Sequence, residues 1–287
     1  MISGIVKIDK ERDFTSQDCD RIVKRQLQVK KTGHLGTLDP FATGLLIVGV
    51  LDGNKIFPLI DDSYKTYVAT LKLGEETNTL DIEGEIIDKK EVGELSLSQM
   101  ESTLHSFLGK GKQIPPLYSA KMINGIRCYH LAREGAKNVS IPEMDIEILD
   151  IQLLSYDEKE HVIVFETTVS KGTYIRTLGK DIAHKLGYPG YLLALRRTKI
   201  GPFDLEGAVK VKEVKESDVF PLEDFIPNIK RMECDDTLAF RVKNGQRLKF
   251  PQEKEEYLLL QHNHKNLAIY QRNGHIYQSY KGFQHEE

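Results

Sequence analysis

The residues best suited to chemistry lie in one short segment, residues 33–44, which reads GHLGTLDPFATG. Its three glycines allow the backbone to pass close to neighbouring groups, and Pro40 restricts the preceding Asp39 to an extended conformation. The segment therefore presents one carboxylate in a fixed pose, and such a carboxylate can act as a nucleophile or as a base. The residue types alone leave a second interpretation open, namely an Asp-Pro turn with a capping carboxylate.

The elements around this segment must hold it in place. Apolar residues with helical spacing behind Ser16 as N-cap predict a helix over residues 16–27, and the apolar run at residues 45–51 predicts a buried strand. Residues 30–43 between them are predicted to be a loop. Further periodic stretches predict strands at residues 2–8, 67–73, 146–156 and 162–169, helices at residues 97–108, 129–134 and 174–186, and a hairpin turn at Asn124-Gly125. Strands interleaved with few helices predict the α+β class, with a mixed, mostly antiparallel central sheet flanked by helices.

Polar residues cluster at residues 228–236, after Ile226-Pro227, and predict a domain boundary there. We therefore expect a catalytic domain over residues 1–230 and a small β-rich module over residues 231–287. Short apolar stretches predict four strands in the module, at residues 239–242, 257–261, 267–271 and 276–280.

Composition limits the classes of protein that remain. The chain has 287 residues, 40% of them hydrophobic, which is enough for a sizeable core. Its three cysteines are widely spaced and include no CxxC pair, which argues against a disulfide framework or a zinc site. The charged N-terminus does not resemble a signal peptide, and the longest apolar run, residues 45–51, is too short to span a bilayer. The sequence therefore predicts a cytoplasmic protein without a membrane partner.

Charge is unevenly distributed along the chain, although the net charge is only −3. Residues 105–138 contain six basic and one acidic residue, and residues 168–200 contain seven and one. Residues 75–94 compensate with eight acidic and two basic residues. This pattern permits one positive face that could bind RNA phosphates, while ordinary solvated faces are the alternative.

Common cofactor and metal motifs are absent from the sequence. There is no GxxxxGK[ST] phosphate loop, no dinucleotide fingerprint, no HExxH and no GxSxG. The tripeptide HNH at residues 262–264 is too short to be specific. We therefore expect neither a cofactor nor a metal.

Residues 33–44 resemble the catalytic motif of the TruB family of tRNA pseudouridine synthases, GHxGTLDPxATG. The resemblance implies that Asp39 is the catalytic aspartate. It also implies that His34 enters the T loop of tRNA and holds the RNA once the target base has left the loop. Four further blocks resemble the family in the same order, at residues 65–84, 115–135, 170–178 and 195–198.

These blocks imply roles for four more residues. By the resemblance, Tyr67 stacks on the flipped uracil, Arg176 pairs with Asp39, Tyr174 hydrogen-bonds within the pocket and Leu195 forms an apolar wall. Without the resemblance, Tyr67 would be interpreted as a core tyrosine and Arg176 as a cation on a helix surface. The family also implies a pseudouridine synthase fold, a PUA-like C-terminal module, and uridine 55 in the T arm of tRNA as substrate. It further implies a monomer without an obligatory protein partner.

The opening block departs from the family pattern DKPxGxTS. Lys10 is kept, and the resemblance implies that it binds substrate. Glu11 and Asp13 replace the proline and the glycine, so the turn after the first strand is not fixed by the residue types. In the third block Met122 stands where the family has a lysine.

The residue types suit the implied reaction. Conversion of uridine to pseudouridine breaks an N-glycosidic bond, turns the base and joins ribose C1′ to uracil C5, without redox change. The base must leave the RNA loop, and the face of Tyr67 can compensate for lost stacking. A guanidinium such as Arg176 favours the ionised form of a buried carboxylate. Addition to the base, attack at C1′ and proton abstraction from ribose all stay open as roles for Asp39.

Three other classes of protein compete with a stand-alone pseudouridine synthase as the interpretation of these motifs. A guide-RNA-dependent pseudouridine synthase subunit would share the motifs, but this chain lacks long basic tails. A non-catalytic protein that binds or folds tRNA would not need Asp39, Tyr67 and Arg176 together. A glycosidase would need a paired general acid, for which Asp81 is the nearby candidate in a matched block.

Overall fold

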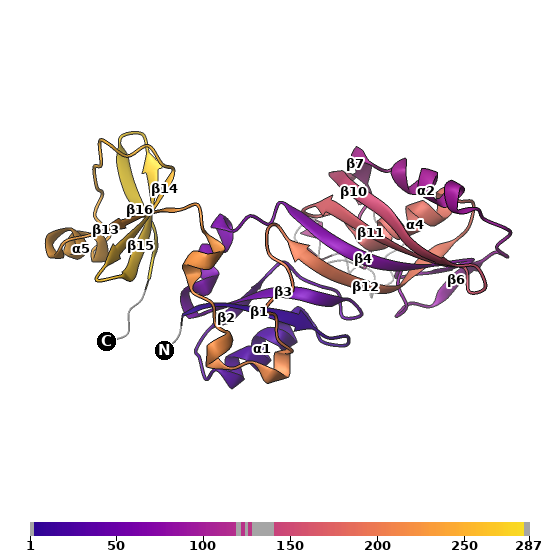
Figure 1. Ribbon diagram of the computed structural model, residues 1–287, viewed down its shortest axis with the longest axis horizontal. Helices are drawn as coiled ribbons and strands as arrows, with labels where there is room; N and C mark the ends of the chain where they lie inside the picture. The colour runs from indigo at the N-terminus through magenta and orange to yellow at the C-terminus, as the bar shows by residue number, and fades with distance from the viewer. Residues whose placement is uncertain (1–2, 119–121, 124–125, 128–140, 284–287) are drawn as a thin grey trace.

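The larger part of the molecule is built on one long sheet (Figure 1). The computed structural model describes residues 3–118, 122–123, 126–127 and 141–283. Seven strands follow one another across the sheet in the order β1 (Gly4–Lys10), β3 (Thr43–Val50), β12 (Gly190–Ile200), β4 (Tyr64–Leu73), β11 (Val162–Ser170), β10 (Met144–Asp157) and β7 (Gly109–Gln113), and β2 (Thr32–Leu35) pairs with β3. Every pairing is antiparallel except that of β12 with β3, which is parallel. The predicted α+β class with a mixed, mostly antiparallel sheet is confirmed.

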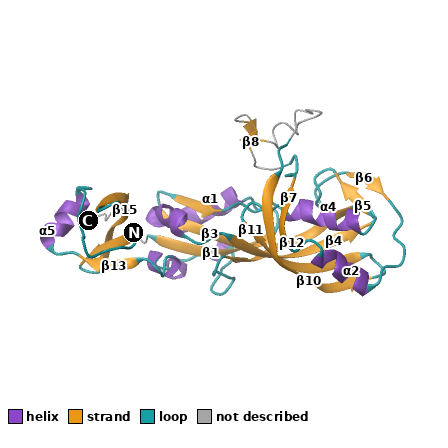
Figure 2. Ribbon diagram, turned by 90° about the horizontal axis from the view of Figure 1, so that it is seen from above, coloured by secondary structure: helices purple, strands orange, loops and turns teal. Residues whose placement is uncertain are grey.

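Helices cover the sheet in two groups, which Figure 2 separates when the molecule is seen from above. α2 (Leu97–His105) and α4 (Ile175–Lys185) lie against the half that contains β4, β10 and β11, where Ile182 is fully buried. α1 (Ser16–Gln26) lies against the β1–β3 half and buries Val23. These helices were expected, and their apolar faces supply the two cores that hold the sheet.

Smaller elements complete this part of the chain. They are β5 (Glu75–Thr77) paired with β6 (Ile86–Lys89), β8 (Met122–Ile123) paired with β9 (Ile126–Arg127), and the 3₁₀ turns η1 (Leu51–Leu59), η2 (Val211–Glu213), η3 (Glu216–Asp218) and η4 (Leu222–Phe225). The predicted hairpin at Asn124-Gly125 therefore has antiparallel strands on both sides, although the two turn residues lie outside the described residues. The helix predicted at residues 129–134 also lies outside them.

The parallel joint between β3 and β12 is the point at which the two halves of the sheet meet. It consists of two residue pairs, Arg196 with Thr43 and Arg197 with Gly44. Gly44 has a φ of +100°, and a Cβ there would lie 2.2 Å from the backbone oxygen of Arg197. Only glycine allows so close an approach. The last residue of the 33–44 segment is thereby fixed against β12.

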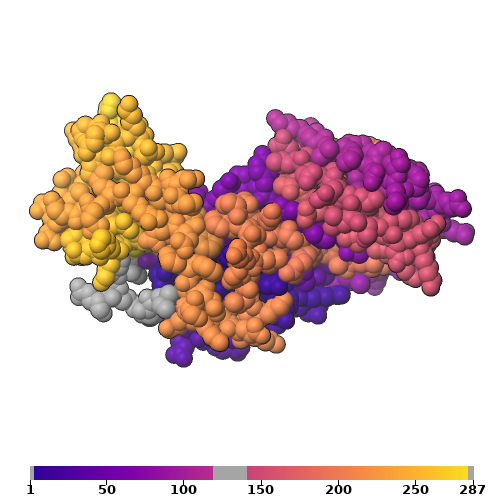
Figure 3. All heavy atoms as spheres, viewed as in Figure 1, coloured from indigo at the N-terminus to yellow at the C-terminus, as the bar shows by residue number. Residues whose placement is uncertain are grey.

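A second sheet forms the C-terminal part of the chain, which Figure 3 shows as a separate lobe at one end of the molecule. Its strands are β13 (Lys230–Glu233), β14 (Tyr257–His262), β15 (Lys265–Asn273) and β16 (Ile276–Gly282), in that order. Leu259 and Ile269 of this sheet share a buried cluster with Ile5 and Phe225 of the larger part. The lobe is therefore tied to the rest of the molecule by apolar packing.

The strand predicted at residues 239–242 is wrong, because these residues belong to helix α5 (Asp236–Lys243). The Asp235 carboxylate accepts a hydrogen bond from the Leu238 backbone N–H at 2.7 Å and caps the helix. Ala239 and Val242 are both buried, three residues apart on one helix face. A four-residue apolar run fits a strand and a helix equally well. Here the Asp235 cap stabilises the helix.

Two further predictions need correction. Residues 32–35 form strand β2 inside the region expected to be a loop. The N-cap of α1 is Thr15 rather than Ser16, since Thr15 and Asp18 form a reciprocal capping box. In the described part of the chain, no helix is long and apolar enough to cross a membrane.

Candidate active site

The turn that carries Asp39 is held from below by the segment after β1. The carbonyl of Pro40 accepts hydrogen bonds from the Asp13 backbone N–H at 3.0 Å and from the Lys10 ammonium at 3.1 Å. Lys10 is fully buried and also donates to the carbonyls of Phe14, at 2.7 Å, and of the neighbouring residue in sequence, at 3.0 Å. An ammonium has three protons, so this geometry leaves none for the direct substrate contact that we expected of Lys10. It places Lys10 under the Asp39 turn instead.

Asp13 keeps the turn that the family forms with glycine. Its φ is +70°, in the left-handed region that glycine adopts without steric cost. Asp and Asn tolerate this region better than other residues, at a cost of about 1 kcal/mol. From this left-handed conformation the Asp13 backbone N–H donates to the Pro40 carbonyl, so the turn supports Asp39 without a glycine at this position.

The other side of the turn is held by α1 and β12. The Ser16 hydroxyl accepts a hydrogen bond from the Leu38 N–H at 3.0 Å and donates to the Leu38 carbonyl at 3.3 Å. Arg197 is fully buried, and its guanidinium donates to the carbonyls of Leu45 at 2.8 Å and of Gly36 and Thr37 at 3.2 Å each. Sequence reasoning missed Arg197, although it lies in a matched block.

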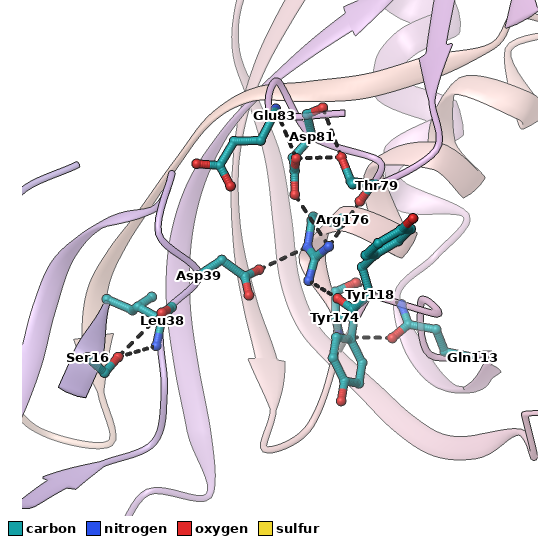
Figure 4. Close-up of polar contacts among 10 residues, drawn as sticks. All are labelled: Ser16, Leu38, Asp39, Thr79, Asp81, Glu83, Gln113, Tyr118, Tyr174 and Arg176. Carbon is teal, nitrogen blue, oxygen red and sulfur yellow. Dashed lines mark hydrogen bonds and ion pairs between the residues drawn. The ribbon is translucent and has the colours of Figure 1, made fainter. Parts of the chain in front are cut away.

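The Asp39 carboxylate meets a buried guanidinium, as Figure 4 shows. Arg176 Nε lies 2.9 Å from Asp39 Oδ2, and Arg176 Nη1 lies 3.3 Å from Asp81 Oδ2. The same guanidinium donates to the carbonyls of Thr79 and Tyr118, at 2.9 Å each. The Arg176 side chain is 5% exposed, while that of Asp39 is 41% exposed. The cation is therefore fixed at four points, and one carboxylate oxygen of Asp39 is held at the opening.

Asp81 is the third member of this charged group, and sequence reasoning considered it only as a glycosidase acid. Its Oδ1 accepts hydrogen bonds from the Thr79 hydroxyl at 2.6 Å and from the Glu83 N–H at 3.1 Å. Burial raises the pKa of the Asp81 carboxyl above its usual range, against the Thr79 hydrogen bond and the charge of Arg176. Asp81 thus places a second carboxylate behind Arg176.

The start of α4 is fixed by one amide side chain. Gln113, buried on β7, donates to the Tyr174 carbonyl at 3.0 Å and accepts from the Tyr174 N–H at 2.8 Å (Figure 4). Because Arg176 is the second residue of α4, this pair of bonds sets the position of its backbone. Gln113 lies in none of the family blocks, so no motif pointed to it.

One cavity of about 270 Å³ opens beside these groups. It is lined by five of the predicted site residues, namely Asp39, Tyr67, Tyr174, Arg176 and Leu195. Tyr67 and Leu195 come from the adjacent strands β4 and β12 and are 8% and 6% exposed. The cavity thus combines a carboxylate, its cation and two apolar walls, which suits a flat heterocycle beside an acidic group.

His34 and Lys10 are absent from the lining of this cavity. His34 lies on β2, and its Nδ1 is 2.7 Å from the Asp20 carboxylate on α1. The carboxylate holds the imidazole in one orientation and can partner its protonated form. In the described part of the chain, no group of three or more His, Cys, Asp or Glu residues could hold a metal ion.

Comparisons with known proteins show the family to which the chain belongs. The family described as TruB family pseudouridylate synthase (N terminal domain) matches residues 24–175, and the tRNA pseudouridylate synthase B C-terminal domain matches residues 176–225. A protein named tRNA pseudouridine synthase B from Oceanobacillus iheyensis is 36% identical, covering 93% of this chain and 92% of that protein. A protein of the same name from Mycoplasma mobile is 43% identical over 76% of each chain.

Solved structures share the fold at low sequence identity. The structure of an H/ACA RNP bound to a substrate RNA containing 2′-deoxyuridine aligns with a TM-score of 0.68 at 19% identity, covering 98% of this chain and 85% of that one. A Cbf5-Nop10-Gar1 complex aligns with a TM-score of 0.67 at 22% identity, covering 93% and 78%. The fold is that of a pseudouridine synthase. Within that class, the matched domains and the identities place this chain in the TruB family of pseudouridylate synthases.

Proposed function

We propose that this chain isomerises uridine 55 in the T loop of tRNA to pseudouridine, with Asp39 as the catalytic carboxylate. One observation carries the proposal: Asp39 and Arg176 form a 2.9 Å ion pair at the opening of a cavity walled by Tyr67 and Leu195. The relatives named tRNA pseudouridine synthase B support tRNA as the substrate. The motif that surrounds Asp39 supports the T loop as the target.

Each predicted residue that lines the cavity is assigned a separate role in the reaction. A uracil that leaves the RNA loop loses its stacking, and the ring of Tyr67 can replace it on one face while Leu195 covers the pocket wall. Arg176 pairs with the Asp39 carboxylate at 2.9 Å and orients it toward the opening, so that it does not swing between rotamers. Tyr174 borders the same cavity and can hydrogen-bond to the bound nucleotide.

Outside the cavity, two regions can bind the remaining RNA. His34 lies on β2, next to the Asp39 turn in sequence, and is held by Asp20, so it can enter the T loop where the uridine leaves. The module of residues 231–287 is proposed as a PUA-like RNA-binding domain attached to a catalytic domain of residues 1–230. We propose that the protein works in the cytoplasm as a monomer, on tRNA alone, without cofactor or guide RNA.

Release of tritium from a T-arm hairpin labelled at uracil C5 tests the function, because joining C5 to ribose expels its hydrogen. The wild-type protein should release tritium without guide RNA, and Asp39→Ala should release none. A filter-binding assay on the same samples should give both proteins similar affinity for the hairpin. Binding without release by the wild type would favour a non-catalytic RNA-binding protein or a guide-dependent subunit. Equal loss of binding and release in Asp39→Ala would contradict the catalytic assignment.

A further inference from the structure

One buried cation in the active-site cavity has no hydrogen-bond partner. Lys65 lies on β4 two residues before Tyr67, so the two side chains point to the same face of the sheet, and both line the cavity. Lys65 is 8% exposed, and among the described residues its ammonium donates no hydrogen bond. The nearest opposite charge is Asp62 Oδ2, at 3.9 Å. That oxygen is itself buried without a hydrogen bond in the described part of the structure.

The other buried cations of the described chain differ from Lys65 in this respect. Lys10 and Arg197 each donate to three backbone carbonyls, and Arg176 contacts two carboxylates and two carbonyls. Unlike Asp62 Oδ2, the Lys65 nitrogen is not among the fully buried atoms without a hydrogen bond, so its ammonium is open to the cavity with three protons to donate. Lys65 is thus a donor whose partner is expected to come from a molecule bound in the cavity.

The surroundings of Lys65 favour a partner with negative charge. Arg197 on β12 and Lys171 after β11 add positive charge, and among the described residues it is Asp62 that opposes them. Lys65, Arg197, Lys171 and Asp62 together sum to +2. Burial first, and then the positive charges of Arg197 and Lys171 against the negative charge of Asp62, together lower the pKa of Lys65 from 10.5 to about 8. The side chain is still mostly protonated at pH 7. A ligand oxygen that gains negative charge would be stabilised here more strongly than in water.

The reaction supplies such an oxygen by either of two routes. If the Asp39 carboxylate adds to uracil C6, the electron pair of the C5–C6 double bond moves onto O4 as an enolate. If the C1′–N1 bond breaks first, its electron pair stays on uracil and spreads over O2 and O4. In both cases a carbonyl oxygen in the plane of the base becomes negative. Lys65 and Tyr67 line the same cavity from one strand, so a base stacked on Tyr67 lies in the cavity that the ammonium borders.

We propose that Lys65 is a further catalytic residue, whose ammonium donates a hydrogen bond to a carbonyl oxygen of the flipped uracil and stabilises the negative charge formed there. The inference rests on the proposed function. It assigns opposite tasks to the two ends of the cavity, with Asp39 acting on the base and Lys65 holding the charge that results.

Lys65→Met tests the proposal, because it keeps the apolar length of the side chain and removes the charge. The matched control is Lys72→Met, on the same strand but on the opposite face, outside the cavity. With enzyme in excess over labelled hairpin, Lys65→Met should slow tritium release about 10²- to 10³-fold, the effect of removing one oxyanion donor. Its dissociation constant for the hairpin should stay within about threefold, and Lys72→Met should match the wild type. Unchanged release by Lys65→Met would overturn the proposal.

A substrate analogue separates a carbonyl oxygen from a phosphate as the partner of Lys65. The analogue carries a neutral methylphosphonate in place of the phosphate 5′ to the target uridine. If Lys65 binds uracil, the slowing caused by Lys65→Met should be the same on the analogue as on ordinary RNA. If the mutation has no effect on the analogue, Lys65 binds the phosphate and the carbonyl assignment is wrong.

The wild-type pH profile tests the proposal without a mutant, in case Lys65→Met does not fold. The second-order rate constant of the free enzyme should fall above pH about 8, as Lys65 loses its proton. Asp62, Lys171 and Arg197 are the charged groups that face it. Where Lys65→Met folds, its profile should lack this decrease. A constant rate up to pH 10 in the wild type would overturn the proposal. An inactive wild type would instead contradict the proposed function itself.

Discussion

Two charged groups border the active-site cavity and are built differently, although both contain buried charge. The Asp39 end consists of Asp39, Asp81 and Arg176, and the Lys65 end consists of Lys65, Lys171, Arg197 and Asp62. At the Asp39 end there are two carboxylates and one guanidinium, and Arg176 contacts both carboxylates and two backbone carbonyls. At the Lys65 end, the charge is +2 and the ammonium has no hydrogen bond among the described residues. The first end is complete before substrate arrives. The second end is arranged so that a bound molecule completes it.

The difference indicates that the Asp39 carboxylate is preorganised, whereas the Lys65 ammonium gains its partner when substrate binds. A carboxylate that must act in one pose gains from a rigid cation, because its orientation need not change during the reaction. A cation that stabilises negative charge formed during the reaction gains from having no other partner, because a competing hydrogen bond would have to break first. The comparison therefore predicts that mutations at both ends lower the rate, with different effects on pH dependence and on protein stability.

The largest effect on this comparison should come from weakening the Asp39 end. Arg176→Lys replaces a planar guanidinium, fixed by two carboxylates and two carbonyls, with a point charge that cannot reach all four. Tritium release at saturating enzyme should fall on the order of 10²-fold or more, with hairpin binding retained. The control is Arg12→Lys at an exposed position, where no change is expected. Near-normal release by Arg176→Lys would argue against the pairing of Arg176 with Asp39.

A smaller effect should follow from changing the charge behind Arg176. Asp81→Asn keeps an oxygen that can accept from Thr79 and Glu83 but removes one negative charge next to the guanidinium. Loss of one charge-assisted contact is worth about 1.5 kcal/mol, so the single-turnover rate should fall about tenfold. An increase in rate would show that Asp81 competes with Asp39 for the guanidinium rather than helping to hold it.

The smallest effect concerns the scaffold beneath Asp39 and should leave the chemistry unchanged. Asp13→Gly removes the cost of a left-handed backbone, so the free energy of unfolding should rise by about 0.5 to 1 kcal/mol. Tritium release should stay at the wild-type rate, since the Asp13 N–H still reaches Pro40. Denaturant melts measure the first quantity. A destabilised Asp13→Gly protein would show that the carboxylate of Asp13, rather than its backbone, supports the turn.

The sequence was sufficient to predict much of this architecture, for physical reasons that can be named. Regular periodicity predicted β4, β10, β11, α1, α2 and α4, because each buries one face against a core. It did not predict β12, where Arg196 and Arg197 interrupt the apolar pattern although Arg197 is buried. The buried arginine depends on carbonyls from residues 36–45, more than 150 residues away in the chain. No local pattern contains that contact.

The site was predictable where the family pattern assigns a role to a residue, and not for every residue that lies in a family block. Asp39, Tyr67, Tyr174, Arg176 and Leu195 were predicted, and all five line one cavity. The residues missed were those whose role depends on three-dimensional surroundings. Gln113 acts on a backbone 61 residues away, and Lys65 differs from an ordinary strand lysine only in its burial and its lack of a hydrogen bond in the described structure.

The most direct test of the central claim is to digest tRNA to nucleosides after incubation with the wild-type protein and to identify the product by chromatography and mass. An isomerase leaves the mass of the RNA unchanged. We therefore predict that one uridine, in the T loop, is replaced by its C-glycosidic isomer and that no free uracil appears. Release of free uracil would show that the protein hydrolyses the N-glycosidic bond instead of isomerising the uridine. Unchanged nucleosides, with the RNA still bound, would show that the cavity holds uridine without converting it.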